Sequence, residues 1–508
     1  MRSAFIGLCL FLGSTNAYSQ LLQLDDLWIK EDLDRLASQG LIAQSAISWP
    51  ISARALAVSL AKIDDAALTD TQRQSVLRLE DYLSQARKTV SNKLSLQLGT
   101  EDAIFHDPSY TIRARNGLSF ESSFARNNIA SDLNSDKAQD RYRYWGEFNA
   151  SLVTDVEQDT LRYDGSVIGA TLGNWLLSVG REDRFWGNGW RHSLILSDNA
   201  RPVTNIAVRR DVAHAFSSPW LSWIGPWSFE SFMGLLDDDR AIEDAKLFGM
   251  SVEFHPHQNL SIGLRRTAQW GGEGRPEDLS SFVDLLIGSD NCDELNESGS
   301  ASCNDRSSEP GNQLAGFDVS FKRFFGLPLQ THLQLVGEDE AGFAPAKNTL
   351  TGGLRYYGQW QGLPLTLNLE AIETRVLSSS DAEFNIFYEH SIYRSGYRYE
   401  GRSIGSTLDN DSRALHLEAM LKTEGYGDFL LGLSRIDLNR DGRGERHSLV
   451  TNAVSINQLS ADWRYKLTGA SSSQHEIAVK LLFHDERVET RLGTLDPFSM
   501  RLGYSIAF

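Results

Sequence analysis

The residues with the clearest chemical potential lie together in one short stretch. Residues 180–202 read GREDRFWGNGWRHSLILSDNARP and combine two adjacent carboxylates with arginines, aromatic side chains and glycines. Neighbouring residues on an extended chain point to opposite faces, so Glu182 and Asp183 do not flank one substrate together. Glycoside hydrolysis needs two carboxyl groups about 5 to 9.5 Å apart across the cleaved bond, so a further carboxylate such as Glu273 would have to supply the partner. The pattern favours binding over catalysis, and we expect no enzymatic activity.

This stretch and residues 266–276 (RTAQWGGEGRP) share the residue types that bind sugars. Flat tryptophan faces suit the C–H side of sugar rings, and arginine binds acidic groups through paired hydrogen bonds. We expect the two stretches to meet at the outer mouth of a β-barrel, because both follow outward-running strands of the barrel predicted below. Their glycines allow tight turns that expose the tryptophans. The candidate glycan-binding residues are Glu182, Arg184, Trp186, Trp190, Arg191, Trp270, Glu273 and Arg275.

A weaker candidate site is the start of a calcium-binding loop. Asp437, Asn439 and Asp441 match the first half of such a loop. The twelfth position is Ser448, so the usual bidentate glutamate is missing, and Arg440 adds positive charge. A hairpin turn built on Asp-Gly is favoured instead. We therefore expect no metal and no cofactor.

The cysteines give one further expectation. Beyond the first 19 residues the chain has only Cys292 and Cys303, which is too few for a disulfide framework. Both lie in residues 289–311, a stretch rich in Asp, Asn, Ser and Gly. In an oxidising compartment we expect the two cysteines to form a disulfide.

The N-terminal part of the chain divides into two segments. Residues 1–19 have a basic start, an apolar stretch too short to span a bilayer and small residues at its end, which is typical of a secretory signal peptide. Residues 20–90 contain three amphipathic stretches with apolar residues at helical spacing. These stretches predict a small helical bundle.

Residues 91–508 show alternation with a period of two. Leu94, Leu96 and Leu98 alternate with polar residues, and similar runs recur to the C-terminus, where residues 497–508 end on an aromatic residue. One apolar and one polar face is typical of a transmembrane barrel, although soluble sheets share it. Short turns alternate with long polar loops at 271–313, 338–348 and 437–453, which favours the barrel. We expect a mainly β fold, a transmembrane antiparallel β-barrel of about 18 strands with a small N-terminal periplasmic helical bundle.

The barrel leaves two other interpretations of the candidate sugar-binding residues. Arginines and carboxylates of residues 180–202 are equally typical of a polar network that packs a loop inside a wide barrel. Any single tryptophan is also expected in the aromatic girdles at the membrane surfaces. The glycines and arginines around Trp186 and Trp270 favour loop positions over a girdle.

Four stretches resemble the Wzi capsule-assembly proteins of the bacterial outer membrane. They are residues 180–202, 224–230 (IGPWSFE), 266–276 and, more loosely, 399–405 (YEGRSIG). The chain departs from the family pattern at Asn188, where proline is expected, and at Phe185, where tryptophan is expected. The resemblance implies a barrel of about eighteen strands closed by the helical bundle, and a lectin-like role.

The function expected from this resemblance is binding and anchoring of capsular or other exopolysaccharide at the cell surface. Expected partners are that polysaccharide, outer-membrane lipid and lipopolysaccharide, and the barrel-assembly machinery. The net charge of −18 argues against nucleic acid. Two alternatives stay open: a porin-like channel for oligosaccharides or other small solutes, and an outer-membrane glycan-modifying enzyme. An open lumen would favour the channel, whereas the helical bundle favours closure.

Overall fold

A computed structural model describes most of the chain. The described residues are 21–24, 26–42, 48–86, 90–102, 104–106, 112–126, 143–154, 160–287, 311–338, 340–341, 344–345, 347–377, 384–423, 425–468 and 473–508. The expected signal peptide, residues 1–19, and the expected disulfide between Cys292 and Cys303 lie outside these residues, so both stay predictions.

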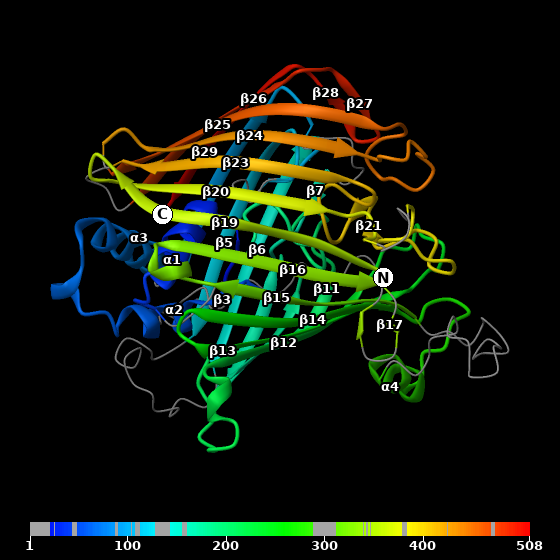
Figure 1. Cartoon of the computed structure of the whole chain (residues 1–508), viewed down its shortest axis with the longest axis horizontal. Helices are drawn as coiled ribbons and strands as arrows, with labels where there is room; N and C mark the ends of the chain where they lie inside the picture. Colours follow the sequence, from blue (N-terminus) through cyan, green and yellow to red (C-terminus); the bar gives the residue numbers. More distant parts are fainter. Residues whose placement is uncertain are drawn as a thin grey trace.

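The described part of the chain forms a closed antiparallel barrel of eighteen strands, as the alternation predicts (Figure 1). The first and last barrel strands pair with each other, Leu96 opposite Tyr504, which removes any free sheet edge. The strands are β4 (Val90–Gly99), β5 (Asn116–Arg126), β6 (Arg143–Thr154), β8 (Val167–Leu172), β9 (Trp175–Gly180), β11 (Thr204–Arg210), β12 (Trp227–Leu235), β13 (Lys246–His257), β14 (Leu260–Trp270), β15 (Gly311–Phe321), β16 (Leu329–Glu338), β19 (Asn348–Trp360), β20 (Leu363–Glu373), β23 (Arg413–Lys422), β24 (Asp428–Leu438), β25 (Val454–Thr468), β26 (Gln474–His484) and β29 (Phe498–Ala507). The two-residue β7 (Leu161–Arg162) adds a short pairing on β6.

Side-chain burial follows the predicted alternation. On β4, Leu94, Leu96 and Leu98 are 39%, 42% and 50% exposed on the outer face, whereas Ser95 and Gln97 point inward and are buried. This apolar band is what a barrel presents to lipid. Most described connections at the end where β4 begins are short; we call this end the helical end and the opposite one the loop end (Figure 1).

The N-terminal region contains the three helices that the spacing predicts. They are α1 (Leu27–Ser38), α2 (Ala53–Leu60) and α3 (Asp70–Ala86). Asp26 caps α1 by accepting the Trp28 N–H at 2.9 Å, and Ser52 caps α2 by accepting the Ala55 N–H at 3.2 Å. Both caps also contact the barrel region: Asp26 pairs with Arg464 at 2.6 Å, and Ser52 donates to Asp211.

Helix α1 lies inside the lumen at the helical end, and all of its side chains are buried. Its charged residues pair with inward-pointing residues of the barrel strands. Lys422 of β23 pairs with Glu31 and Asp32, and Arg355 of β19 pairs with Asp34 at 3.0 Å. Because a buried unpaired charge is costly, these pairs fix the position of the helix in the barrel.

The remaining elements are short. Of the described residues, no helix is long and apolar enough to cross a membrane. The short elements are α4 (Leu279–Ile287), the 3₁₀ turns η1 (Asp65–Ala67), η2 (Ser222–Ile224) and η4 (Phe324–Gly326), and the small strands β1 (Leu21–Leu22), β2 (Ser48–Trp49), β3 (Ile51–Ser52), β10 (Phe185–Trp186), β17 (Glu340–Ala341), β18 (Ala344–Pro345), β21 (Arg398–Tyr399), β22 (Arg402–Ser403), β27 (Val488–Thr490) and β28 (Gly493–Leu495).

Candidate functional site

Residues 181–203 leave β9 at the loop end and fold into the lumen, where they reach the N-terminal region. We call them the plug segment. Within it, β10 pairs with β2, which places Phe185 opposite Trp49. Trp190 lies in a buried apolar cluster with Leu27 and Trp28 of the N-terminal region. The plug segment and the helical region therefore fill the lumen from opposite ends and meet inside it.

A closed set of charges holds the start of the plug segment against the barrel. The Arg184 guanidinium lies 2.9 Å from Glu182 and 2.8 Å from Glu230 of β12. Arg209 of β11 pairs with the same two carboxylates. All four side chains are buried, and the two positive charges balance the two negative ones. Asp183 points elsewhere and pairs with Arg113, so the two adjacent carboxylates do diverge.

The turn of the plug segment depends on one carboxylate of the opposite wall. Glu370 of β20 accepts backbone N–H groups from Trp190 at 2.8 Å and His192 at 2.9 Å, and from Arg191 between them. A Cβ at Gly189 would lie 2.5 Å from this carboxylate and 2.4 Å from the His192 carbonyl, so the turn requires glycine. This geometry gives a physical reason for Gly189 in the motif.

Two of the three predicted tryptophan platforms are not exposed. Trp186 and Trp190 are 0% exposed. Trp186 packs in the lumen core, where its indole N–H donates to Glu230 at 3.3 Å. Arg355 stacks on the Trp190 ring at 4.6 Å. The expectation that these tryptophans face solvent is wrong, because the segment folds inward and their rings fill the space between the barrel and the helices.

The predicted position of Trp270 is also wrong. Trp270 is the last residue of β14 and follows the outward positions Ile262 and Leu264. Its ring packs edge-on against Phe282 of α4, with the ring centroids 5.1 Å apart. The residue therefore lies on the outer face of the barrel, where a girdle aromatic is expected, because the strand continues up to the glycines that follow.

The two stretches predicted to bind sugar do lie close together, but they meet within the lumen and not at its mouth. Tyr397 joins them: its hydroxyl contacts the Ile195 carbonyl at 2.8 Å and the Thr267 hydroxyl at 2.9 Å. Of the eight candidate residues, Glu273 is exposed and Arg275 is half-buried, and both lie in the loop that follows β14.

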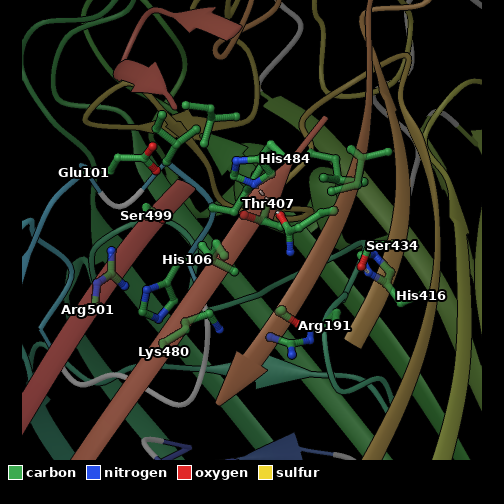
Figure 2. Close-up of a pocket in the computed structure, with 18 of the residues that line it drawn as sticks. Glu101, His106, Arg191, Thr407, His416, Ser434, Lys480, His484, Ser499 and Arg501 are labelled. Carbon is green, nitrogen blue, oxygen red and sulfur yellow. Dashed lines mark hydrogen bonds between the residues drawn. The ribbon is translucent and has the colours of Figure 1, made fainter. Parts of the chain in front are cut away.

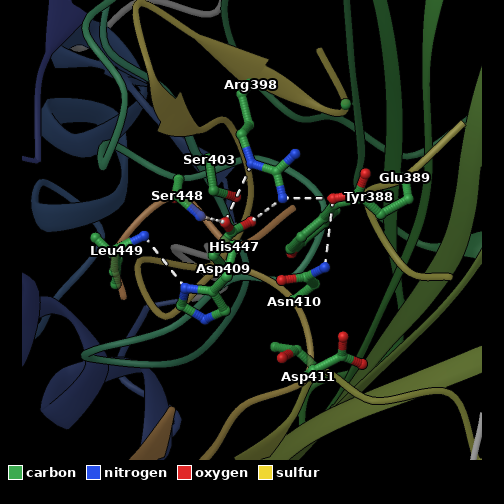
Figure 3. A network of polar contacts seen from close by, with 12 residues as sticks. Tyr388, Glu389, Arg398, Ser403, Asp409, Asn410, Asp411, His447, Ser448 and Leu449 are labelled. Carbon is green, nitrogen blue, oxygen red and sulfur yellow. Dashed lines mark hydrogen bonds and ion pairs between the residues drawn. The ribbon is translucent and has the colours of Figure 1, made fainter. Parts of the chain in front are cut away.

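A second buried network covers the plug segment at the loop end (Figure 3). Arg398 lies between two carboxylates, 2.7 Å from Glu389 and 2.9 Å from Asp409. Asn410 donates to Glu389 at 3.3 Å. Burial raises the pKa of Glu389 to about 7, although the adjacent Arg398 opposes this shift. Residues 384–412 thus close the lumen from the loop end with charges of their own.

The calcium candidate has its carboxylates engaged by the protein. Asp437 pairs with Arg413 at 2.7 Å, and Asp441 accepts the Asn385 side-chain N–H at 2.6 Å. The Gly442 N–H donates to the Asn439 carbonyl at 2.9 Å and closes the predicted Asp-Gly turn. Among the described residues, no group of three or more His, Cys, Asp or Glu side chains has a geometry that could hold a metal ion.

One cavity of about 80 Å³ lies at the loop end, between the plug segment and strands β24, β25, β26 and β29 (Figure 2). We call this cavity the loop-end pocket and these four strands the pocket wall. Three cations line the pocket: Arg191 of the plug segment, Lys480 of β26 and Arg501 of β29. Hydroxyl and amide groups lie between them, contributed by Thr407, Ser434, Gln458, Ser460 and Ser499.

Histidines line the same pocket and make polar contacts. The Nε2 atoms of His192 and His416 lie 2.8 Å apart, so one donates and the other accepts. Burial and the adjacent Arg191 lower the pKa of His192 to about 3, which keeps this ring neutral at ordinary pH. His106 approaches Asp198 at 3.2 Å, and His484 contacts Gln458 at 3.0 Å. The pocket therefore offers cations, hydroxyls and imidazole rings to a polar ligand.

Sequence reasoning found only Arg191 of the residues that line this pocket. Lys480, Arg501 and His416 occupy inward positions of their strands, where the alternation already predicts polar residues. The alternation does not indicate which strands lie opposite the plug segment, so it could not bring these three residues together. The sequence signal that could have found Lys480 and Arg501 is a positively charged residue at an inward strand position.

Comparison with known proteins identifies the relatives of this fold. Residues 80–488 match the family model described as capsule assembly protein Wzi. The chain belongs to the Wzi family. Within it, the chain is 30% identical to an uncharacterized 55.8 kDa protein in the cps region of Klebsiella pneumoniae, over 73% of this chain and 68% of that protein.

A solved Wzi structure has the same fold. Wzi of Escherichia coli, described as a carbohydrate-binding β-barrel of the outer membrane involved in group 1 capsule assembly, matches 96% of this chain and 99% of its own, with 24% identity and a TM-score of 0.78. Membership of the Wzi family and the eighteen-stranded barrel place the chain in the bacterial outer membrane.

Proposed function

We propose that the protein is a non-catalytic lectin of the outer membrane that holds capsular or other exopolysaccharide at the cell surface. The observation that carries the proposal is the loop-end pocket, which places three cations and several hydroxyls beside a filled lumen. The loop end faces outward and the helical end faces the periplasm, because barrels of this class have short periplasmic and long external connections. Lipopolysaccharide around the barrel and the barrel-assembly machinery are proposed as further partners.

The filled lumen supports binding over transport. Helix α1 occupies the helical end, the plug segment crosses the interior, and residues 384–412 cover the loop end. A porin-like channel needs a continuous aqueous path through the lumen, which barrels of about 16 to 18 strands have when nothing fills them. The side chains that would line such a path are instead paired with the helix and the plug segment.

The carboxylates support binding over hydrolysis. Glu182 and Asp183 each pair with arginine, and they diverge. In the pocket, Glu101 and Asp102 are again sequence neighbours, and Glu101 accepts the Asp496 N–H. A retaining or inverting glycosidase needs two carboxyl groups that face each other across the glycosidic bond.

The pocket suits a sugar that carries an acidic group. Arginine and lysine bind carboxylates by charge-assisted hydrogen bonds, and serine and glutamine bind sugar hydroxyls. Arg191 pairs with Glu418, and Lys480 pairs with Asp462. Lys480 and Arg501 are the candidates for direct contact with the ligand, because they lie opposite each other on β26 and β29 and both line the pocket. Of the other residues predicted from the sequence, Glu182, Arg184, Trp186 and Trp190 would support the plug segment, while Glu273 and Arg275 would extend the binding surface.

The test compares an acidic and a neutral polysaccharide on the purified barrel in detergent. Lys480→Ala and Arg501→Ala should each weaken binding of a uronate-containing capsular polysaccharide by roughly tenfold, because one charge-assisted hydrogen bond contributes about 1.5 kcal/mol or more. Neutral dextran should bind weakly to all forms. Arg487→Ala is the matched control, since Arg487 is 63% exposed at the loop end and is not one of the residues that line the pocket.

Folding of each variant is checked by the change in gel mobility on heating, because Lys480 also pairs with Asp462. Unchanged binding by both folded pocket variants would contradict the proposed site. A large solute conductance of the wild-type barrel in planar bilayers would contradict the proposal of a closed lectin.

A further inference from the structure

The connection between β11 and β12 differs from the other described connections at the helical end. Residues 211–226, which we call the aromatic loop, are longer than the tight turns between β8 and β9 or β19 and β20. Trp220 is 86% exposed and Trp223 is 65% exposed. From residue 213 to 226 the loop contains no Asp, Glu, Lys or Arg, although the chain as a whole carries 23% charged residues. Two exposed indoles on an uncharged loop indicate contact with something apolar.

The aromatic loop begins at the aromatic girdle of the barrel. On the outer face of the helical end, Trp175 packs edge-on against Phe229, with ring centroids 6.0 Å apart. Arg210 lies over the Trp227 ring at 3.8 Å. Phe216 of the loop stacks on the same Trp227 ring, with ring centroids 4.8 Å apart and the rings almost parallel. The loop therefore continues the girdle outward from the barrel and does not turn under the lumen.

The aromatic loop is held in a fixed conformation. Gly225 has a φ of +72°, and a Cβ there would lie 1.9 Å from the His255 carbonyl, so this close approach to β13 requires glycine. The His255 N–H donates to the Pro226 carbonyl at 3.0 Å. Ser222 and Gly225 close successive turns around η2. Exposure of the two indoles is thus built into the fold and is not the consequence of a loose loop.

The direction in which the aromatic loop projects indicates what it contacts. The loop projects from the side of the barrel beyond β12 and β13, across the direction in which the strands run (Figure 1). At this depth lies the girdle, and tryptophan concentrates where a membrane meets water. A segment that leaves the girdle sideways remains at that depth and meets the lipid around the barrel.

The loop end of the same flank carries a second lateral element. Helix α4 packs on the outer face of β13 and β14, where Phe282 contacts Phe248 at a centroid distance of 5.2 Å. On its other side, Leu279 is 77% exposed and Val283 is 44% exposed. One flank of the barrel thus carries apolar side chains beyond its wall near both membrane surfaces.

We propose that the aromatic loop is a membrane-interface element, in which Trp220 and Trp223 insert among the phospholipids that surround the helical end of the barrel. Together with α4 it fixes the depth and tilt of this flank in the membrane. The proposal concerns lipid contact and is independent of polysaccharide binding. Insertion of this kind follows from the buried apolar area of the indoles and from their preference for the interface.

The experiment measures tryptophan fluorescence of the full chain reconstituted into phosphatidylcholine vesicles. The emission lost in the double variant Trp220→Ser/Trp223→Ser belongs to the two loop indoles. We expect this difference emission to be strongly quenched when the acyl chains are brominated near the headgroup, and to resist quenching by aqueous acrylamide. Leu77→Trp is the matched control, because Leu77 is 56% exposed on α3. Its added emission should respond to acrylamide and not to brominated lipid.

The single variant Trp220→Phe covers the case in which the double variant does not fold, since Trp220 has the larger exposure and an aromatic ring is retained. Difference emission quenched by acrylamide and unaffected by brominated lipid would overturn the proposal. If the same indoles were protected from acrylamide in whole cell envelopes but not in vesicles, a protein partner would cover the loop and the lipid proposal would be wrong.

Discussion

Two walls of the same barrel use inward polar residues in different ways. On β14, β15, β16, β19 and β20, which we call the packed wall, inward side chains such as Thr267, Asp318, Arg355 and Glu370 are 0% exposed. On the pocket wall, Lys480, Ser460 and Ser499 keep a few per cent of their surface, and cavities lie against them at both ends of the lumen.

The difference follows from what each wall contacts. The long charged side chains of the packed wall pair with the plug segment or with α1, as Glu370 does with three backbone N–H groups. On the pocket wall, Ser434, Ser460 and Ser499 are small, and a cavity lies between them and the plug segment. Inward charges of the packed wall therefore contact only protein, whereas Lys480 and Arg501 of the pocket wall also line the loop-end pocket.

The largest effect is expected when a charge is removed from the buried group that holds the plug segment, which is formed by Glu182, Arg184, Arg209 and Glu230. Glu230→Gln leaves Arg184 and Arg209 with one carboxylate between them in a buried site. We expect a loss of about 3 to 5 kcal/mol, as for other broken buried pairs. The measurement is the denaturant midpoint of unfolding in detergent. Arg501→Gln on the pocket wall should cost much less, because the Arg501 side chain is only half-buried, and equal losses would refute the distinction between the walls.

The buried network in Figure 3 makes the stability of residues 384–412 depend on pH. The pKa of Glu389 is raised to about 7 in the fold, so the folded state binds this proton more tightly than the unfolded state does. The resulting stability is present below about pH 4.5 and is lost as pH rises to about 7, on the order of 3 kcal/mol. Arg398, Asp409 and Arg446 act on the same group.

Hydrogen–deuterium exchange of residues 384–412, corrected for the intrinsic pH effect, measures this change. Protection should fall between pH 4.5 and 7 in the wild type and fall less in Glu389→Gln, where Asp411, whose pKa burial also raises to about 7, still titrates. The matched control is Glu489→Gln, since Glu489 is 74% exposed. A Glu389→Gln variant that kept the wild-type pH profile would show that another group is responsible.

Local patterns made the fold predictable, because strand alternation and helical spacing depend on neighbours in sequence. The outward leucines of β4 and the three N-terminal helices lie where those patterns predict. The site was harder, because Lys480 and Arg191 meet only after the plug segment enters the lumen. Trp270 shows a limit of another kind. Ile262 and Leu264 face outward on β14, and because side chains alternate along a strand, Trp270, eight residues after Ile262, also faces outward. The following glycines suggested a loop too early.

The smallest expected effect concerns that tryptophan. Trp270→Ala removes the edge-on contact with Phe282, a pair that contributes about 0.5 to 1.5 kcal/mol beyond its buried area. Helix α4 should therefore become more sensitive to limited proteolysis, while the unfolding midpoint of the barrel changes little. Because Trp270 faces away from the lumen, binding of the uronate-containing polysaccharide should be unchanged, in contrast to Lys480→Ala. Weakened binding in Trp270→Ala with normal protection of α4 would mean that sugar stacks on this ring on the outer face, and that the glycan site extends from the pocket wall to the opposite flank of the barrel.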